Sequence, residues 1–338
     1  MRTAEPDHDI EQLLLDLREG RVFPTVQKID LRNAVLKDRD LSGMNLAGAD
    51  LSGADLHGAN LSGAILFKAN LQRANLMRAN LNGAELSAAD LTDADLEGAQ
   101  AREVGLGMAI LHRAHLFRAD LYHATLTRAD LTGADLRCAD LQRTRLREAR
   151  LGCDFTGADL READLTSAEV SGASFVDVDF RHAILHAVTG YEKANWVGSD
   201  MRDVNFSGAY QLRRFAMDQN YIKEFRSRSR YTGMLYYLWW LTSDCGRSIT
   251  RWCFVIAFVA CFYAFLYSFV ELDYGKHEPG WFSSLYYSVV TMTTLGFGDI
   301  VPISIAAEVL SMLEVLTGYI MLGGLLSIFS NKIARRAE

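Results

Sequence analysis

The sequence has little of what marks a secreted, disulfide-bonded or zinc-binding protein. Among its 338 residues there are only five cysteines, and none shows the paired CxxC spacing typical of zinc sites. We therefore expect neither a disulfide framework nor a zinc site, and we interpret the cysteines as small buried hydrophobic residues. They are Cys138, Cys153, Cys245, Cys253 and Cys261.

Other signals are missing as well. The first residues, MRTAEPDHDIEQLLLDL, contain no basic stretch followed by an apolar core, so no secretory signal is expected. The chain has no glycine-rich nucleotide fingerprint. Its net charge of −7 argues against nucleic-acid binding as the main role. The mean hydropathy is near zero because a polar N-terminal part is averaged with an apolar C-terminal part.

What the sequence has in excess is leucine at a fixed interval. From Leu31 to Leu151 every fifth residue is leucine except Ala101, which makes 24 of 25 positions. Alanine usually stands two residues before each leucine, and Asp or Asn one residue before it. On an α-helix, steps of five would carry the leucines around the axis, and on a strand they would alternate between faces. The leucines can all face inward only if the chain turns once in each repeat.

This pattern resembles the A(D/N)LXX motif of the pentapeptide-repeat family, over residues 29–210. The resemblance implies a right-handed quadrilateral β-helix, with leucine and alanine filling a narrow interior. The five-residue step slips after Leu151 and again over residues 187–193, and the stretch around Gly105 is expected to form an irregular corner. We expect the rod to have a regulatory, assembly or partner-binding role, with a cytoplasmic protein as one candidate partner.

Residues 1–28 are predicted to be a helical cap on the first coil of the rod. Ile10, Leu13, Leu14 and Leu17 have helical spacing, and Asp9 precedes them as a candidate N-cap. Such a cap would cover an exposed edge of the β-helix, which would otherwise invite aggregation.

Residues 211–251 are predicted to connect the rod to the C-terminal part. Tyrosine and tryptophan alternate with basic residues here, and both aromatic types favour the membrane interface. We hypothesise one or two interfacial helices in this stretch, with anionic lipids bound within residues 226–251. A packed collar that touches no lipid is the alternative.

Two apolar stretches near the C-terminus have the length of membrane spans. Residues 252–270 contain no charge, and at ~1.5 Å per residue they can cross a hydrocarbon core of ~30 Å. Residues 303–330 form a second predicted span. The apolar segment 281–294 between them is too short to cross, so we predict a re-entrant helix there. The pore domain would then occupy residues 252–338.

After this short helix the chain reads TMTTLGFGD over residues 291–299. Together with the two spans, the segment resembles the selectivity filter of two-transmembrane-span potassium channels. The resemblance implies a filter over residues 294–299, in which a dehydrated ion is held by backbone carbonyls. Those expected to coordinate K⁺ belong to Thr294, Leu295, Gly296 and Phe297. Gly298 and Asp299 complete the filter.

The resemblance also assigns supporting roles. Tyr286 and Tyr287 stand where family members have an aromatic cuff, and Thr293 is expected to support the filter. Val290 stands where some members carry a glutamate that partners the filter aspartate, so Asp299 is expected to lack that partner. Phe297 replaces the commoner tyrosine and brings no hydroxyl.

Two positions in the second span carry further expectations. Glu314 is expected to form a hydrogen bond toward the pore helix or to support the filter, without contacting the ion. Gly318 lies twenty residues after Gly298, the spacing of a gating hinge. Close packing of small residues explains Gly318 equally well.

The distribution of basic residues predicts the orientation. They gather before the first span and after the second, whereas the loop between has Lys276 alone. The positive-inside rule then places both termini in the cytoplasm, and we expect a prokaryotic inner membrane. The flanking basic residues are Arg226, Arg228, Arg230, Arg247 and Arg251 before the first span, and Lys332, Arg335 and Arg336 after the second.

These observations predict a passive, non-enzymatic, potassium-selective channel. Its permeant ion is K⁺, no cofactor is expected, and one filter strand per chain implies a homotetramer. No span has periodic arginines, so no voltage sensor of the usual kind is expected. Two alternatives remain open: a membrane-tethered pentapeptide-repeat interaction scaffold, and a nonselective cation channel.

Overall fold

The computed structural model describes residues 6–19, 29–246 and 248–334. The chain separates into two compact units, Met1–Lys223 and Glu224–Glu338. Arg247, Arg335 and Arg336, which contribute to the predicted orientation, lie outside the described residues.

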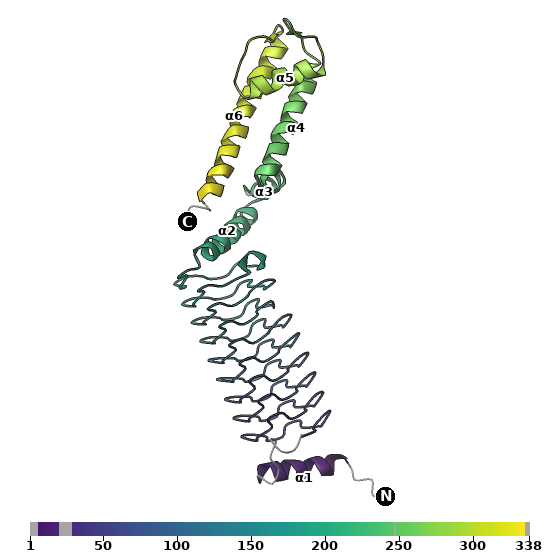
Figure 1. The fold of residues 1–338 in the computed structure, drawn as a ribbon, viewed down its shortest axis with the longest axis vertical. Helices are drawn as coiled ribbons and strands as arrows, with labels where there is room; N and C mark the ends of the chain where they lie inside the picture. The colour runs from purple at the N-terminus through teal and green to yellow at the C-terminus, as the bar shows by residue number, and fades with distance from the viewer. Residues whose placement is uncertain (1–5, 20–28, 247, 335–338) are drawn as a thin grey trace. The chain divides into compact units, whose positions relative to one another are not determined.

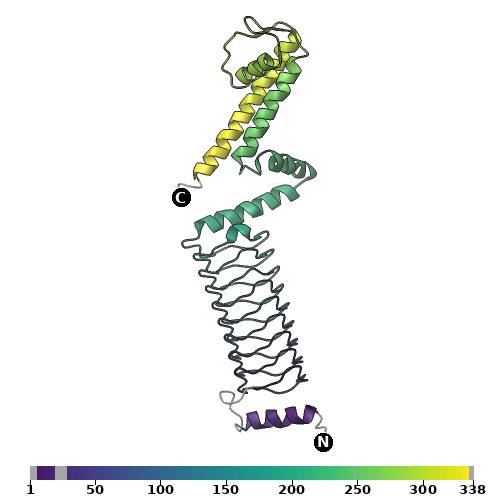
Figure 2. The ribbon, with the colours of Figure 1, turned by 45° about the vertical axis from the view of Figure 1, so that its right-hand side comes forward.

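The first unit is dominated by a four-sided β-helix, as predicted from the leucine repeat (Figures 1 and 2). Short parallel bridges run from Asp30↔Asp50 to Ile184↔Asn205, and most of them join residues that are 20 apart. Because each side takes five residues, 20 residues make one coil. The predicted fold class is therefore confirmed.

Each corner follows from the residues that flank the leucine. In the repeat at Leu51, the amide of Ala54 donates to the Leu51 carbonyl at 3.0 Å, which closes a turn. Gly53 takes the third turn position with φ of 68°, where the left-handed region suits glycine. The Asp50 carboxylate accepts from the Ser52 amide at 3.2 Å. This Asx turn explains why Asp or Asn precedes most of the leucines.

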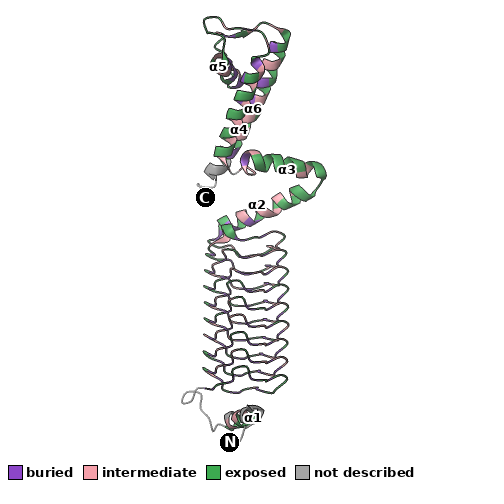
Figure 3. Cartoon of the chain, turned by 90° about the vertical axis from the view of Figure 1, so that its right-hand side faces the viewer, coloured by how far each residue is buried: buried purple, intermediate pink, exposed green. Residues whose placement is uncertain are grey.

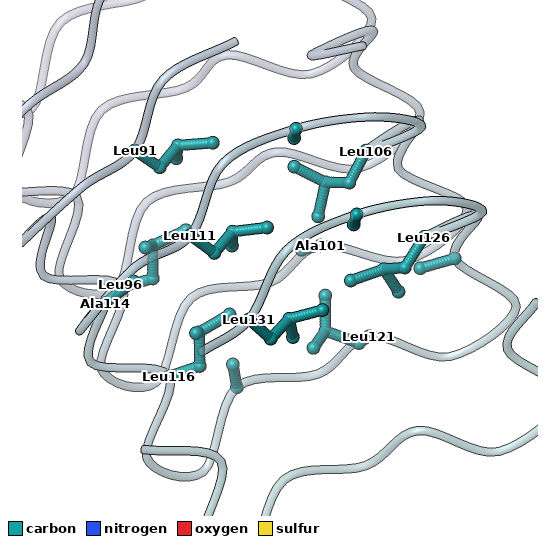
Figure 4. Close-up of a cluster of buried hydrophobic side chains, with 14 of the residues drawn as sticks. Leu91, Leu96, Ala101, Leu106, Leu111, Ala114, Leu116, Leu121, Leu126 and Leu131 are labelled. Carbon is teal, nitrogen blue, oxygen red and sulfur yellow. The ribbon is translucent and has the colours of Figure 1, made fainter. Parts of the chain in front are cut away.

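Leucine and alanine alternate in filling the interior (Figure 4). Ala101, the exception to the leucine series, is also buried, at 2% exposure. Thr144 takes an alanine position and is buried because its hydroxyl donates to the Leu141 carbonyl at 2.7 Å. A buried hydroxyl is tolerated when such a bond is made. The interior is therefore a continuous apolar column along the rod.

The irregularities lie at two of the three predicted places. Bridges shorten to 19 residues at Asp135↔Asp154 and lengthen to 21 at Ser174↔Asn195, where the 3-10 helix η1 (Tyr191–Lys193) fills the extra length. Gly105 is regular, since it bridges Glu85 and Thr125 like its neighbours. The irregular corner predicted there is wrong, because a glycine in the residue-before-leucine position keeps the backbone path.

The N-terminal helix α1 (Pro6–Arg18) begins before Asp9, so Asp9 is not its N-cap. Proline fits the first turn of a helix because it lacks an amide hydrogen, and this explains the earlier start. Leu13 and Leu14 pack against the core of the rod. Arg18 pairs with Asp40 at 2.8 Å. The side chains of Ile10 and Leu17 lie outside the described residues.

The other end of the rod is closed by α2 (Tyr210–Ser227). Leu212 and Ala216 are buried in the rod core. The Gln219 amide accepts from the Trp196 backbone amide at 2.8 Å and donates to the Ala194 carbonyl at 3.2 Å. The first part of the predicted connector is thus a rod cap, because the last coil needs partners for its unpaired backbone groups.

This cap predicts a stability effect. Replacing both Gln219 and Asn220 with alanine removes bonds to the Trp196 and Gly198 amides, which lie 2.8 and 2.6 Å from their acceptors. We expect a loss of about 1–3 kcal/mol for each amide left unpaired. Thermal unfolding of the full-length protein would measure it. Met217→Ala, at a position 57% exposed on the same helix, is the control and should change little. An equal effect of both variants would contradict the capping role.

The second unit consists of helices that pack on one another and a small β-ribbon. They are α3 (Arg230–Ser243), α4 (Ile249–Tyr267), α5 (Trp281–Met292) and α6 (Ile305–Ala334), with β1 (Leu272–Asp273) antiparallel to β2 (Val301–Pro302). α4 and α6 run side by side, with the shorter α5 packed against both (Figures 1 and 2). Ile249–Tyr267 and Ile305–Ser330 are long and apolar enough to cross a membrane.

In each of these two helices only 11% of the most apolar 18 residues are buried, which is not the pattern of a core helix in a soluble domain (Figure 3).

The helix bounds differ by a few residues from those predicted. α4 begins at 249 because the Ser248 hydroxyl accepts from the Arg251 amide at 3.2 Å as an N-cap. α5 ends at Met292, before the predicted 294, because Thr294 has a φ of 59° and leaves the helical region.

Candidate functional site

The segment after α5 has an unusual backbone. Thr294, Gly296 and Gly298 have φ of 59°, 52° and 72°, whereas Leu295 and Phe297 between them have negative φ. In an ordinary strand, successive carbonyls alternate sides. Alternation of left- and right-handed backbone instead turns neighbouring peptide groups toward one side, the arrangement that a column of carbonyl ligands requires. Two of the three left-handed positions are glycines, which adopt this conformation at no steric cost.

The end of α5 holds the start of this segment. The Leu295 amide donates to the Val290 carbonyl at 3.0 Å, and the Thr294 amide donates to the Thr291 carbonyl at 3.0 Å. The Thr293 hydroxyl donates to the Val289 carbonyl at 2.7 Å. Orphan carbonyls at the helix end are thereby satisfied. Val290 itself is buried at 6% exposure, as an apolar side chain.

Asp299 closes the segment and has partners. The Tyr286 hydroxyl donates to its carboxylate at 2.6 Å, and the Nε2 atom of His277 lies 3.0 Å from the same oxygen. The carboxylate therefore has support from α5 despite Val290. The Tyr286 hydrogen bond, more than the smaller contribution of His277, keeps the pKa of Asp299 below its usual value, against the opposing effect of burial.

Glu314 is fully buried between the three helices that pack together. The Tyr267 hydroxyl of α4 donates to one carboxylate oxygen at 2.6 Å. The Ser288 hydroxyl of α5 bonds to the other, and it also lies 2.9 Å from the Ala260 carbonyl. One carboxylate thus joins α4, α5 and α6, because a buried carboxylate needs hydrogen-bond donors on both oxygens.

Ser311 extends this network by about one turn toward the N-terminus of α6. Its hydroxyl donates to the Ala307 carbonyl at 2.8 Å and lies 3.0 Å from the Tyr287 hydroxyl and 3.2 Å from the Tyr267 hydroxyl. The rings of Tyr267 and Tyr287 meet edge to face with centroids 4.9 Å apart. Tyr287 is therefore held by the span helices, whereas Tyr286 holds Asp299.

Gly318 of α6 packs against the C-terminal end of α5. A Cβ atom at this position would collide with the carbonyl oxygen of Met292. Glycine is therefore required here for close approach of α6 to the end of the pore helix. Gly324 has an equivalent role against the Trp252 indole, whereas nothing lies within 4 Å of a Cβ at Gly323. A gating hinge at Gly318 stays a prediction.

The cysteines do not form a site in the described part of the chain. Cys153 is buried inside the rod, as predicted, and burial raises the pKa of its thiol. Cys138, Cys253 and Cys261 are exposed, so the prediction of burial is wrong for them in a single chain. Cys253 and Cys261 lie on α4, which is apolar enough to cross a membrane, so exposure in a single chain does not mean contact with water. Within residues 6–19, 29–246 and 248–334, no three His, Cys, Asp or Glu side chains gather as metal ligands.

Comparison with known proteins assigns both units to families. Residues 250–335 match the family model described as an ion channel. Eight copies of the pentapeptide repeat match within the first unit. The chain is a fusion of a pentapeptide-repeat rod and an ion-channel domain. The repeat matches cover residues 29–66, 69–104, 114–151 and 152–187.

Individual relatives cover one part or the other. Two-pore potassium channel 1 of Arabidopsis thaliana is 38% identical over 64 residues, which are 19% of this chain and 18% of that protein. This chain thus spans less than a fifth of the length of that curated relative.

Solved structures resemble the rod. HetL, a pentapeptide repeat protein of the cyanobacterium Nostoc sp. involved in heterocyst differentiation regulation, is 31% identical, with 59% of this chain and 94% of that chain covered and a TM-score of 0.35. QnrB1, a plasmid-mediated fluoroquinolone resistance protein, is 21% identical, with coverage of 56% and 96% and a TM-score of 0.42.

Sequence reasoning missed several residues of this site. His277 carries no motif, and only the pairing of β1 with β2 brings its loop beside Asp299. Tyr267 and Ser288 are common residues of apolar helices, and their sequence gives no signal that they share the Glu314 carboxylate. Ser311 does not bond to this carboxylate, so donors at helical spacing from Glu314 give no signal either.

The buried carboxylate leads to a second prediction. Glu314→Leu removes the carboxylate that bonds to the Tyr267 and Ser288 hydroxyls, and leaves them the Ser311 hydroxyl at 3.2 Å and the Ala260 carbonyl at 2.9 Å as partners. Because two buried hydrogen bonds are lost, we expect a loss of about 1–3 kcal/mol in the free energy of unfolding. Glu314→Gln keeps one acceptor and should be milder. Thermal stability of the detergent-purified protein measures the order. Glu308→Gln, on the exposed start of α6, is the control. If Glu314→Leu is as stable as the control, the carboxylate does not join the helices.

Proposed function

We propose that this protein is a potassium-selective channel that conducts K⁺ passively across a membrane. The observation that carries the proposal is the alternation of φ over residues 294–298, in a TLGFG sequence at the end of a short helix between two apolar helices. The match of residues 250–335 to an ion-channel family supports it. The potassium channel relative supports K⁺ as the ion.

In this proposal the carbonyls of Thr294, Leu295, Gly296 and Phe297 replace the water around the ion. Uncharged oxygens suit a monovalent cation because they supply a moderate field without trapping it. α5 points its carbonyl end toward the filter, and the negative end of its dipole favours a cation there. Gly298 and Asp299 complete the outer end of the filter, where Tyr286 holds the carboxylate at 2.6 Å.

One chain supplies one strand of carbonyls, so the channel is proposed to be a homotetramer. The exposed side chains of a single chain support this. Leu295 and Phe297 are 61% and 64% exposed, and Met312 and Leu316 on α6 are 67% and 60% exposed. Apolar patches of this kind mark contact with other chains or with lipid. The remaining exposed apolar surface of α4 is proposed to face lipid.

The position of the chain in the membrane follows from charge. Basic residues flank the two spans on the side of both termini, which the positive-inside rule assigns to the cytoplasm. The proposed location is a prokaryotic inner membrane. The rod would then lie in the cytoplasm.

The rod is proposed to regulate or assemble the channel. Its outer arginines are largely paired with neighbouring carboxylates, as in Arg161 with Asp159 at 2.7 Å and Arg181 with Asp179 at 2.6 Å. Paired charges leave little field to attract nucleic acid. They fit a protein partner or a spacer better, and a tethered interaction scaffold stays the alternative function.

Potassium flux through the purified protein in liposomes tests the main proposal. We expect K⁺ to pass and Na⁺ to be excluded. Gly298→Ala should abolish the selective flux, because alanine resists a φ of 72° and the carbonyl column would be broken. Gly323→Ala is the matched control, since its Cβ meets nothing within 4 Å. Equal K⁺ and Na⁺ flux would favour a nonselective channel, and no flux from a folded tetramer would favour the scaffold.

We also propose that α3 lies at the inner membrane interface. Tyr231, Met234 and Leu241 on this helix are 83%, 74% and 67% exposed. The Arg226 guanidinium lies 5.4 and 5.5 Å from the Tyr236 and Tyr237 ring centroids. Aromatic rings beside arginines are typical of the headgroup region, where anionic lipids can pair with the cations.

This placement predicts retention of anionic lipid. Changing Arg226, Arg228 and Arg230 together to glutamine should lower the number of anionic lipids that remain on the purified protein, counted by native mass spectrometry, because each cation contributes ~1 kcal/mol near an anionic surface. Neutralising Arg73, Arg78 and Arg118 on the rod removes the same charge and should leave the number unchanged. If the two triple variants retain the same number, α3 is a collar that binds no lipid.

A further inference from the structure

The outer end of the filter has a second neighbour besides the pore helix. β1 pairs with β2 through Leu272↔Pro302 and Asp273↔Val301, which places the loop after β1 beside Asp299. At Gly275 the loop after β1 touches the backbone of Asp299, because a Cβ at Gly275 would lie 2.7 Å from the Asp299 carbonyl oxygen. The loop that contains His277 is thus positioned by backbone contacts on both sides.

The His277 side chain is aimed at the Asp299 carboxylate from this loop. The backbone amide of His277 donates to the Tyr274 carbonyl at 2.8 Å, which closes a turn. The imidazole Nε2 atom lies 3.0 Å from the Asp299 carboxylate. The ring packs on Tyr286 with centroids 5.3 Å apart. His277 and Tyr286 therefore meet each other and share one carboxylate oxygen as partner.

The charged and titratable groups around His277 are few. From the filter end it faces Asp299, and from α5 it faces the Tyr286 hydroxyl. The residues next to His277 in its own loop are Lys276 and Glu278. Within the described part of the chain, neither side chain contacts the imidazole. The His277 and Asp299 side chains are 39% and 35% exposed, so protons in the outer solution reach the pair.

We propose that His277 is a positioning residue for the filter aspartate and makes the outer mouth of the channel sensitive to external pH. The inference deepens the proposed function and rests on it. When His277 is neutral, each chain presents one negative charge at the pair. When His277 is protonated, the imidazolium and the Asp299 carboxylate form an ion pair with no net charge.

This change acts on the ion through the electrostatic potential at the mouth. Negative charge at a pore entrance raises the local concentration of cations, and mobile ions screen the effect. Protonation of the imidazole by an acidic outer solution therefore removes the attraction. Inward K⁺ current should fall as external pH falls, and the fall should be larger at low ionic strength.

Single-channel recording of the full-length protein in planar bilayers tests the inference. For the wild type at low ionic strength we expect the inward unit current to decrease about twofold or more between external pH 7.5 and 5.5, and less at high salt. His277→Gln keeps a hydrogen-bond donor but cannot be charged, so the ratio of its unit currents at pH 7.5 and 5.5 should be close to one. Lys276→Gln, which removes a cation from the neighbouring position, is the matched control and should respond like the wild type.

The outcomes separate the inference from the function on which it rests. A His277→Gln channel with the pH response of the wild type overturns the inference alone, and so does a wild-type current that is constant between pH 7.5 and 5.5. Loss of the response in both His277→Gln and Lys276→Gln would assign it to loop charge in general and would also overturn it. Absence of K⁺ current at every pH from the wild-type protein overturns the proposed function together with the inference.

Discussion

The need of every backbone amide and carbonyl for a partner governs both units of this chain. In the rod, each side both donates to and accepts from the coil next to it, as when the Leu51 amide donates to the Asn70 carbonyl and the Asn70 amide donates to the Ala49 carbonyl. Such a stack can grow by repetition, but its two ends are left with unpaired groups. α1 covers the first coil, and α2 supplies the Gln219 and Asn220 amides to the last. The length of the rod is therefore limited by its caps.

The same constraint takes a different form in the second unit. Helices satisfy their own backbone, which is why they can cross lipid, and irregular backbone at that depth needs protein or water beside it. The only such stretch between α5 and α6, within the described residues, is the segment from 293 to 304, and α5 holds its beginning through the Val289 and Val290 carbonyls. Over residues 294–298 the alternating φ leaves the carbonyls proposed to bind ions without a hydrogen bond from the described backbone amides. Potassium in the proposed function supplies the missing interaction.

Two carboxylates support this arrangement from different sides. Glu314 joins α4, α5 and α6 behind the filter, where two hydroxyls compensate its burial. Asp299 joins the filter end to α5 and to the loop after β1, where it remains partly exposed to solvent. The pore helix has Val290 at the position where related filters place a carboxylate, and it contributes Ser288 and Tyr286 as donors to carboxylates on other segments. The proposed filter is thus supported by contacts among several segments and not by one helix alone.

The sequence alone determined the features that depend on a local period or on a short motif. A five-residue leucine step admits one arrangement in which all leucines are buried, so the four-sided β-helix, its interior and two of its slips could be predicted. Segment lengths and apolar runs likewise predicted two spans with a short helix between them, with errors of a few residues at ends decided by the Ser248 cap and by the φ of Thr294. Only the tertiary structure decided the contacts between segments distant in sequence. The use of α2 as a rod cap, the three-helix role of Glu314 and the approach of His277 to Asp299 all depend on where separate elements meet. Such contacts leave no period in the sequence, because they are fixed by packing and by hydrogen-bond satisfaction in three dimensions.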